Sequence, residues 1–291
     1  MPLPPALDPA FEEALRHVLD HPGNLVRPWL VVEIGAAYGL ERERTLKLAI
    51  ALEYFHTASL IFDDLPSMDN ARERRGVPCV HRVCGEAGAI LTALALINRA
   101  YAMIWQAAAG APAARQAEAL CLVEESLGIC GALNGQSLDL RYARLPHTPK
   151  TNERIAMEKT VALIRLTLEL PAILGGASRR ELHLLDRIAV FWGLAYQIVD
   201  DLKDMHLPAS ESGKTTARDA LLDHPNLAAV LGAEGASARL KRLIGLGERS
   251  LDGLRMRRRT LGPLDRLRGQ LEAEAARVFA WRELASPGGT E

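Results

Sequence analysis

The strongest constraint on the fold is a helical spacing of apolar residues that recurs from Pro9 almost to the end of the 291-residue chain. These residues are mostly Ala and Leu, whereas aromatic residues make up only 5% of the chain, and this bias favours helix over strand. Short Gly- and Pro-rich turn signals divide the pattern into segments of roughly 12–25 residues, as in helical bundles. The sequence therefore predicts an all-α fold.

We expect a single domain over residues 1–291. The chain is 48% hydrophobic, which is enough for one large core, and no internal repeat or low-complexity linker divides it. Residues 286–291 are expected to form a disordered tail. The N-terminal segment has no basic region before an apolar core, and no stretch of about 18 uncharged apolar residues occurs, so neither a signal peptide nor a membrane span is predicted.

Charge and cysteine content limit the partners and the compartment. The formal net charge of −1 gives no whole-molecule field that would attract nucleic acid or anionic lipid, so neither is an expected partner. The four cysteines contain no Cys-x-x-Cys pair and suggest no disulfide framework. A reducing, cytoplasmic location fits this pattern best.

Two clusters of aspartates follow apolar runs, and their members are Asp63, Asp64 and Asp69 in the first, and Asp200, Asp201 and Asp204 in the second. In the second cluster the first and last carboxylates are four residues apart, so a regular helix already groups them. In the first cluster Pro66 makes an unbroken helix unfavourable. A local bulge there would bring all three carboxylates onto one wall.

Closely packed carboxylates predict a cation. They repel one another, and burying them without a partner is costly. Mg²⁺ is a common solution, because it binds one or two carboxylates together with phosphate oxygens. A single acidic pair is equally consistent with a solvated helix end, but two clusters that each end an apolar helix favour two Mg²⁺-binding walls with a polyphosphate between them.

The surrounding residues resemble the trans-isoprenyl diphosphate synthase (polyprenyl synthetase) family, in particular the bacterial farnesyl and geranylgeranyl diphosphate synthases. The similar stretches, in the family's order, are residues 56–70, 74–76, 135–140, 159–163, 196–204 and 213–215. The first contains the longer DDxxxxD spacing of these bacterial enzymes. The resemblance covers roughly residues 20–230. It implies an isoprenoid synthase bundle of helices around a central cavity, and a homodimer.

The resemblance also implies roles for individual residues. All six aspartates would bind Mg²⁺, with three ions in each active site. The allylic diphosphate would be held by Arg74, Lys159, Thr160, Gln197 and Lys214, the last four being the predicted catalytic residues. Isopentenyl diphosphate would be held by Arg27, His56 and Arg75, with Asn24 beside them. The allylic C1–O bond would then ionise, and the isopentenyl double bond would attack the cation in a water-poor cavity.

The chain departs from the family at two positions. Where relatives carry Gly-Lys-x-x-Arg-Pro, residues 23–28 read Gly-Asn-Leu-Val-Arg-Pro, so Asn24 replaces a lysine that binds isopentenyl diphosphate. Loss of such a charge-assisted contact costs about 1.5–3 kcal/mol. Leu94 stands where many relatives carry an aspartate, and we interpret it as a change in packing.

Product length is predicted from the helix before Asp63. Ala58, five residues earlier, occupies a position that is often aromatic in bacterial farnesyl enzymes, so Ala58 and Ser59 would leave the product tunnel open. Tyr54 and Phe55 lie one turn deeper, about 5.4 Å, which is close to one isoprene unit. They would close the tunnel, which favours the C20 product geranylgeranyl diphosphate over the C15 product farnesyl diphosphate.

Two other functions remain open. A class I terpene cyclase shares a helical fold and an aspartate motif, but it usually carries an Asn/Ser/Glu metal motif on the second wall, where this chain has a second aspartate cluster. A non-catalytic or partner-dependent subunit of a prenyl synthase would agree with the change at Asn24. Such subunits commonly lose an aspartate motif, and both are present here.

Overall fold

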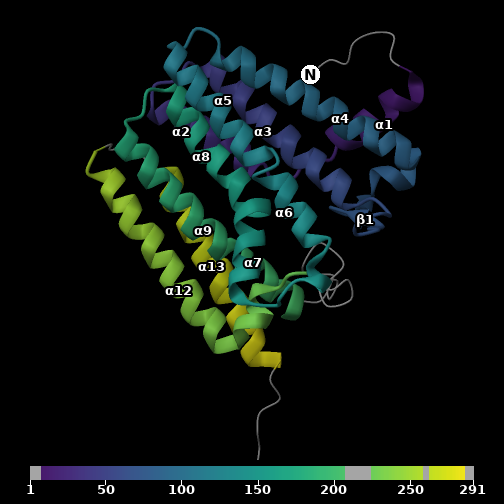
Figure 1. Ribbon diagram of the computed structural model, residues 1–291, viewed down its shortest axis with the longest axis vertical. Helices are drawn as coiled ribbons and strands as arrows, with labels where there is room; N and C mark the ends of the chain where they lie inside the picture. The colour runs from purple at the N-terminus through teal and green to yellow at the C-terminus, as the bar shows by residue number, and fades with distance from the viewer. Residues whose placement is uncertain (1–7, 207–223, 258–261, 286–291) are drawn as a thin grey trace, which may run out of the picture.

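The computed structural model describes residues 8–206, 224–257 and 262–285. They form a bundle of long helices, which confirms the all-α prediction (Figure 1). The helices are α1 (Pro9–Leu19), α2 (Val26–Ala37), α3 (Arg42–Asp63), α4 (Val80–Ala108), α5 (Ala113–Leu127), α6 (Ala132–Asp139), α7 (Pro149–Ala156), α8 (Ala162–Leu174), α9 (Arg179–His206), α12 (Leu227–Arg255) and α13 (Gly262–Ala285). A 3₁₀ turn, η1 (Tyr142–Arg144), and a π-helical turn, η2 (Met157–Val161), complete the helical segments.

Two short strands, β1 (Glu73–Arg74) and β2 (Val77–Pro78), form an antiparallel hairpin between α3 and α4. Arg74 pairs with Val77, so Arg75 and Gly76 form a two-residue turn. Both turn residues have positive φ, 57° and 79°. Such a turn matches the twist of a tight hairpin and favours Gly, which explains the turn signal in the sequence.

Capping residues define several helix starts. Asp8, Thr148 and Asn226 each accept a hydrogen bond from the backbone N–H three residues later. Pro follows Asp8 and Thr148 directly, at a position where the missing N–H has no cost. These local signals fix where α1, α7 and α12 begin.

Three helices are longer than the predicted segments: α4 and α12 have 29 residues each, and α9 has 28. One of the glycine turn signals, Gly232, coincides with a kink inside α12, and a similar kink at Gly85 lies inside α4. Proline disfavours a helix interior, but α8 contains Pro171 and continues past it to Leu174. Gly85 and Gly232 have non-helical backbone angles and therefore interrupt α4 and α12, whereas α8 accommodates Pro171 in its buried interior.

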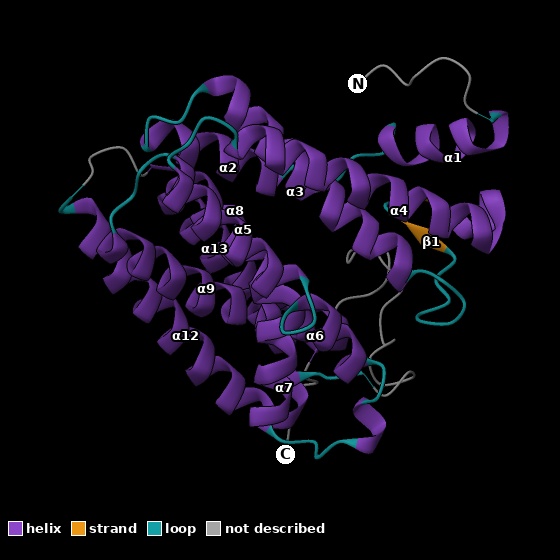
Figure 2. Ribbon diagram, turned by 45° about the horizontal axis from the view of Figure 1, so that its top comes forward, coloured by secondary structure: helices purple, strands orange, loops and turns teal. Residues whose placement is uncertain are grey.

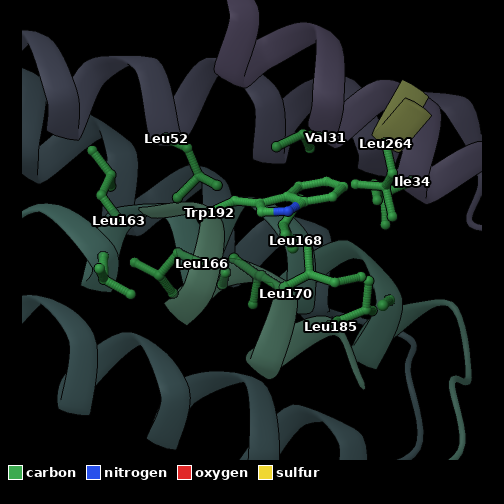
Figure 3. Close-up of a cluster of buried hydrophobic side chains, with 14 of the residues drawn as sticks. Val31, Ile34, Leu52, Leu163, Leu166, Leu168, Leu170, Leu185, Trp192 and Leu264 are labelled. Carbon is green, nitrogen blue, oxygen red and sulfur yellow. The ribbon is translucent and has the colours of Figure 1, made fainter. Parts of the chain in front are cut away.

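The main core is formed mostly by side chains of α2, α3, α4, α5, α8, α9, α12 and α13, whose arrangement Figures 1 and 2 show. Trp192 of α9 lies among Val31, Ile34 and Leu52, which come from α2 and α3 (Figure 3). Its indole N–H donates a hydrogen bond to the carbonyl oxygen of Ile244 at 3.3 Å, so the buried polar atom is satisfied. This core fixes α3 and α9, which carry the two aspartate clusters at their C-terminal ends.

A second, smaller cluster joins α1, the end of α3 and the start of α4. Its buried members are Ala14, Ala58, Ile61, Leu65, Val80, Ala89, Ala93 and Leu96. Because many of these side chains are alanine, α3 and α4 pack closely along their length.

One face of α4 remains apolar and exposed. Ile90, Leu91, Leu94, Tyr101 and Trp105 are between 39% and 63% exposed. Leu94 therefore does not fill the core, contrary to the packing interpretation above; it belongs to a surface stripe. Contiguous exposed apolar surface of this kind marks an interaction face.

By length and composition alone, α4 and residues Arg179–Met205 of α9 are apolar enough to cross a membrane. Neither helix contains a run of about 18 uncharged residues, so the sequence predicts no span there. The test by length and composition accepts them because it allows up to two charged residues in an 18-residue window. About half of the relevant α9 window is buried within the bundle, as in core helices. The two helices are therefore weak support for a membrane span.

Candidate active site

One cavity of about 450 Å³ lies where the C-terminal ends of α3 and α9 face α6, η2 and the segment before α12. The predicted site residues that line it are Arg27, His56, Ser59, Asp63, Asp69, Arg74, Lys159, Thr160, Gln197, Asp200, Asp201 and Asp204. Those that do not line it are Asn24, Tyr54, Phe55, Ala58, Asp64 and Arg75. Lys214 lies outside the described residues. Among the described residues that line the cavity, seven are Asp or Glu and three are Lys or Arg.

The first aspartate cluster is divided between two directions. α3 ends at Asp63, and the chain turns back so that the backbone N–H of Asp69 donates to the carbonyl oxygen of Asp63 at 2.9 Å. Asp63 and Asp69 therefore both line the cavity. Asp64 is only 4% exposed and accepts two hydrogen bonds from Arg74, Nη2 to Oδ1 at 2.7 Å and Nε to Oδ2 at 2.8 Å. The expectation that all three carboxylates share one wall is wrong for Asp64.

Arg74 reaches this position because it lies at the end of β1. Its guanidinium makes a bidentate pair with Asp64 while the side chain also borders the cavity. A bidentate pair fixes the orientation of the guanidinium. Asp64 thus orients a cation at the cavity wall.

Three arginines surround His56 of α3, and two of them, Arg27 and Arg74, line the cavity. Burial, together with the positive charges of Arg27, Arg75 and Arg74, lowers the pKa of His56 to about 2. Burial likewise lowers the pKa of Arg27. Several guanidinium groups around one neutral imidazole make a favourable environment for an anion.

Arg75, one of these arginines, and Asn24 lie outside the cavity lining. The Arg75 guanidinium packs against Gly23, where an added Cβ would lie 2.4 Å from Nη2, and Nη1 donates to the carbonyl oxygen of His21 at 3.3 Å. Asn24 is exposed, and its Oδ1 accepts a hydrogen bond from the Val26 N–H at 3.3 Å. In this structure Arg75 contacts the segment before α2, and Asn24 contacts the first residue of α2.

The second aspartate cluster lies in the last turns of α9, and all three of its carboxylates line the cavity, as helical spacing predicts. Asp200 and Asp204 lie on the same helix face. Asp201 is 1% exposed, and its Oδ1 accepts a hydrogen bond from Gln197 Nε2 at 2.8 Å. This wall lines the same cavity as Asp63 and Asp69.

The π-turn η2 carries Lys159 and Thr160, and π-turns often occur at functional sites. Lys159 Nζ bonds to Asp139 and lies 3.9 Å from Asp63 Oδ1. Burial alone would lower the pKa of Lys159, but the charges of Asp63 and Asp139 outweigh it and raise the pKa. Thr160 Oγ1 donates to Gln197 Oε1 at 2.8 Å, which joins η2 to α9.

Gly135 allows α6 to approach η2. A Cβ at this position would lie 2.5 Å from the backbone nitrogen of Lys159 and 2.8 Å from the backbone carbon of Glu158. No side chain fits between the two segments. The glycine therefore brings Asp139, at the end of α6, within bonding distance of Lys159.

Sequence reasoning assigned no role to Asp139 or His224, yet both line the cavity. His224 Nδ1 lies 3.1 Å from Asp139 Oδ1, and Nε2 lies 3.7 Å from Asp69 Oδ1. The hydrogen bond with Asp139 raises the pKa of His224. Asp139 could have been found from its place in the stretch 135–140, but His224 offers only a proline-containing turn as a signal.

Comparison with known proteins identifies the family. Residues 8–254 match the family model described as Polyprenyl synthetase. The chain belongs to the polyprenyl synthetase family. This confirms the resemblance drawn from the aspartate clusters.

Named members of the family are similar over most of the chain. Farnesyl diphosphate synthase of Escherichia coli is 37% identical over 237 residues, which cover 80% of this chain and 78% of that protein. Geranylgeranyl diphosphate synthase of Pseudescherichia vulneris is 35% identical over 240 residues, covering 82% and 76%.

Solved structures of similar proteins have the same fold as this chain. An FPP/GFPP synthase from Zymomonas mobilis is 30% identical with a TM-score of 0.77, covering 93% of this chain and 90% of that one. A geranyltransferase from Helicobacter pylori, solved with magnesium and isoprenyl diphosphate, is 28% identical with a TM-score of 0.78, covering 96% and 91%. The isoprenoid synthase fold is therefore confirmed.

The residues predicted to set product length lie on different sides of α3. Ser59 borders the cavity, but Ala58 is fully buried in the small cluster against α4. Phe55 is 7% exposed and packs edge-to-face on Tyr101 of α4, with ring centroids 4.9 Å apart. Tyr54 packs against both apolar clusters. The rotation of α3 about its axis thus directs Ser59, and not Ala58, towards this polyprenyl synthetase cavity.

Proposed function

We propose that this chain is a Mg²⁺-dependent short-chain prenyl diphosphate synthase, which condenses isopentenyl diphosphate with allylic diphosphates to a C15 or C20 product. The observation that carries the proposal is that two acidic walls and a group of arginines face one cavity with apolar lining. The names of similar relatives, geranylgeranyl and farnesyl diphosphate synthases, support it.

The donor set fits Mg²⁺. Asp63 and Asp69 on one wall, and Asp200 and Asp204 on the other, offer the hard carboxylate oxygens that this ion prefers. Burial raises the pKa of Asp63, so its ionised form needs a cation. We expect three ions per site, and the Helicobacter pylori neighbour solved with magnesium supports the choice of metal. When bound, Mg²⁺ would neutralise diphosphate oxygens and stabilise the leaving group.

Cationic side chains assign the two substrates to two parts of the cavity. Lys159 and Arg74 adjoin the aspartates, so they hold the allylic diphosphate, with Thr160 and Gln197 as hydrogen-bonding groups. Arg27 and His56 hold isopentenyl diphosphate. Because the pKa of His56 is about 2, its imidazole is neutral at physiological pH and provides an N–H donor while the arginines provide the charge.

The reaction follows from this arrangement. The allylic C1–O bond breaks, and its electron pair leaves with the diphosphate, where Lys159 and Arg74 stabilise the developing charge. The isopentenyl double bond then supplies two electrons for the new C–C bond, and the released diphosphate accepts the proton that is lost. Leu60, Phe62 and Leu163 keep water away from the cation.

The chain acts as a cytoplasmic homodimer in this proposal. The exposed apolar stripe on α4 supports self-association, because a second copy would remove Leu91, Leu94 and Trp105 from water. The four cysteines, all within the described residues, form no disulfide with one another, which agrees with a reducing compartment.

A product assay tests the proposal. Purified protein is incubated with Mg²⁺, labelled isopentenyl diphosphate and dimethylallyl, geranyl or farnesyl diphosphate, and products are identified by mass spectrometry. A C15 or C20 diphosphate is expected. Cyclic hydrocarbon products would instead identify a terpene cyclase, and no elongation by folded protein would favour a partner-dependent subunit.

Alanine variants then test the walls. Asp63→Ala and Asp200→Ala are expected to abolish condensation while the helical circular dichroism spectrum is unchanged. Asp252→Ala, on the exposed face of α12, is the matched control and should keep full activity. Near-normal turnover by either wall variant would contradict the metal assignment.

A further inference from the structure

Asp201 differs from its neighbours in the second aspartate cluster because its carboxylate contacts the start of another helix. Oδ2 accepts hydrogen bonds from the backbone N–H groups of Leu227 at 2.6 Å and Ala228 at 3.3 Å. Leu227 is the first residue of α12. N–H groups in a first turn have no acceptor within their own helix, and a carboxylate there is further stabilised by the helix dipole.

The backbone strengthens this link between α9 and α12. Asn226, the N-cap of α12, donates from Nδ2 to the carbonyl oxygen of Asp201 at 3.3 Å, and its Oδ1 accepts from the Ala229 N–H at 2.7 Å. Asn226 and Asp201 are 8% and 1% exposed. The end of α9 and the start of α12 are thus joined through buried hydrogen bonds, which persist because breaking them leaves unpaired polar groups.

This link determines where His224 lies. His224 is two residues before the N-cap, and it contacts Asp139 on α6 and Asp69 after α3. Asp139 also bonds to Lys159, whose neighbour Thr160 bonds through Gln197 to Asp201. The contacts therefore form a closed ring around the cavity. Movement of the α12 start would displace His224 from both carboxylates.

We propose that Asp201 is a positioning residue rather than a Mg²⁺ ligand: it anchors the start of α12 and so places His224 between the two aspartates of the cavity. The inference rests on the proposed function, because it assigns one aspartate of that site a different task. The contact between Asp201 and the start of α12 can be measured without enzymatic turnover.

Adjacent aspartates provide a matched comparison. Asp201→Asn and Asp200→Asn remove the same charge one residue apart. The side-chain oxygen of an asparagine at 201 still accepts hydrogen bonds from the α12 N–H groups. Its NH₂ group can donate to Gln197 if the Gln197 amide rotates by half a turn, and the rotated Gln197 NH₂ then donates to the Thr160 hydroxyl. Calorimetry with Mg²⁺ and an unreactive allylic thiolodiphosphate should show a loss of Mg²⁺ affinity in Asp200→Asn, whereas Asp201→Asn keeps the wild-type affinity. Equal losses in both variants would overturn the proposal.

Removal of the carboxylate tests the anchor. Asp201→Ala should increase amide hydrogen exchange at residues 226–230 and raise the KM for the allylic diphosphate more than it lowers kcat. Asp201→Asn should restore both properties. His224→Ala should raise the same KM without affecting exchange, and the double variant should add little to Asp201→Ala. Unchanged exchange in Asp201→Ala would refute the anchor.

The two levels of failure can be separated. If the wild-type protein forms no product, the proposed function fails, but the exchange and Mg²⁺-binding comparisons remain decisive for Asp201. If the wild-type protein is active and Asp201→Asn behaves as Asp200→Asn does, the function stands and the positioning role is refuted.

Discussion

Replacing Gly135 by alanine sets two opposing effects against each other. In an exposed helix the change would stabilise the protein by up to about 1 kcal/mol, because alanine is the better helix former. Here the new Cβ would lie 2.5 Å from the backbone nitrogen of Lys159, and an ordinary contact of 3.4 Å leaves a shortfall of about 0.9 Å. Both sides of the contact are backbone, so a whole segment must move. Overpacking of this kind costs about 1–3 kcal/mol, so the clash outweighs the propensity gain.

The displacement also has a catalytic consequence. A movement of about 1 Å between α6 and η2 separates Asp139 from Lys159, and misplacement on this scale lowers kcat by about a hundredfold. Urea unfolding and steady-state kinetics measure the two effects. The control is Gly269→Ala in α13, where a Cβ has no neighbour within 4 Å and the change should stabilise. Wild-type stability and kcat in Gly135→Ala would refute the close approach of α6 and η2.

Three further predictions follow, two from the site and one from a buried carboxyl group elsewhere in the bundle. Ser59→Tyr should shorten the product, because Ser59 borders the cavity, whereas Ala58→Tyr should mainly lower Tm by overpacking; mass spectrometry and thermal unfolding distinguish them. Asn24→Lys should lower the KM for isopentenyl diphosphate by adding a cation near Arg27, and an unchanged KM would mean that the added charge does not reach the substrate. Burial raises the pKa of Glu169 to about 7, so the folded state keeps a proton that the unfolded chain releases above its ordinary pKa. Stability is therefore lost as pH rises through 7, and Glu169→Gln should be more stable than the wild type at pH 8, by at most about 3 kcal/mol. Urea unfolding at pH 5 and 8 measures this, and a constant difference would contradict it.

Helical spacing predicts the parts of the site that depend on one helix. Asp200 and Asp204 meet because residues four apart share a face, whatever surrounds the helix. The direction of Asp64 depends instead on Arg74, which reaches it only after a hairpin has formed. The periodicity of α3 therefore cannot predict whether Asp64 pairs with Arg74 or lines the cavity.

Rotation of a helix about its axis is equally invisible in its own sequence. Ala58 and Ser59 are both small, and only the packing of α3 on α4 decides which of them borders the cavity. His224 shows the same limit more strongly, because its neighbours Asp69 and Asp139 are distant in sequence and meet it through three separate elements. The sequence predicts which residues carry charge, and tertiary contacts decide what each charge does.

The excess of carboxylates in the cavity has a consequence for the lifetime of the protein. Like charges held together in a low-dielectric space favour any state that separates them, and unfolding is one such state. A cation or a cation–phosphate complex that binds only the folded chain stabilises it against unfolding. The gain in the free energy of unfolding grows with the logarithm of the ligand concentration divided by its dissociation constant. The empty protein is therefore the form most readily degraded, and its abundance in a cell rises with the supply of its own ligands.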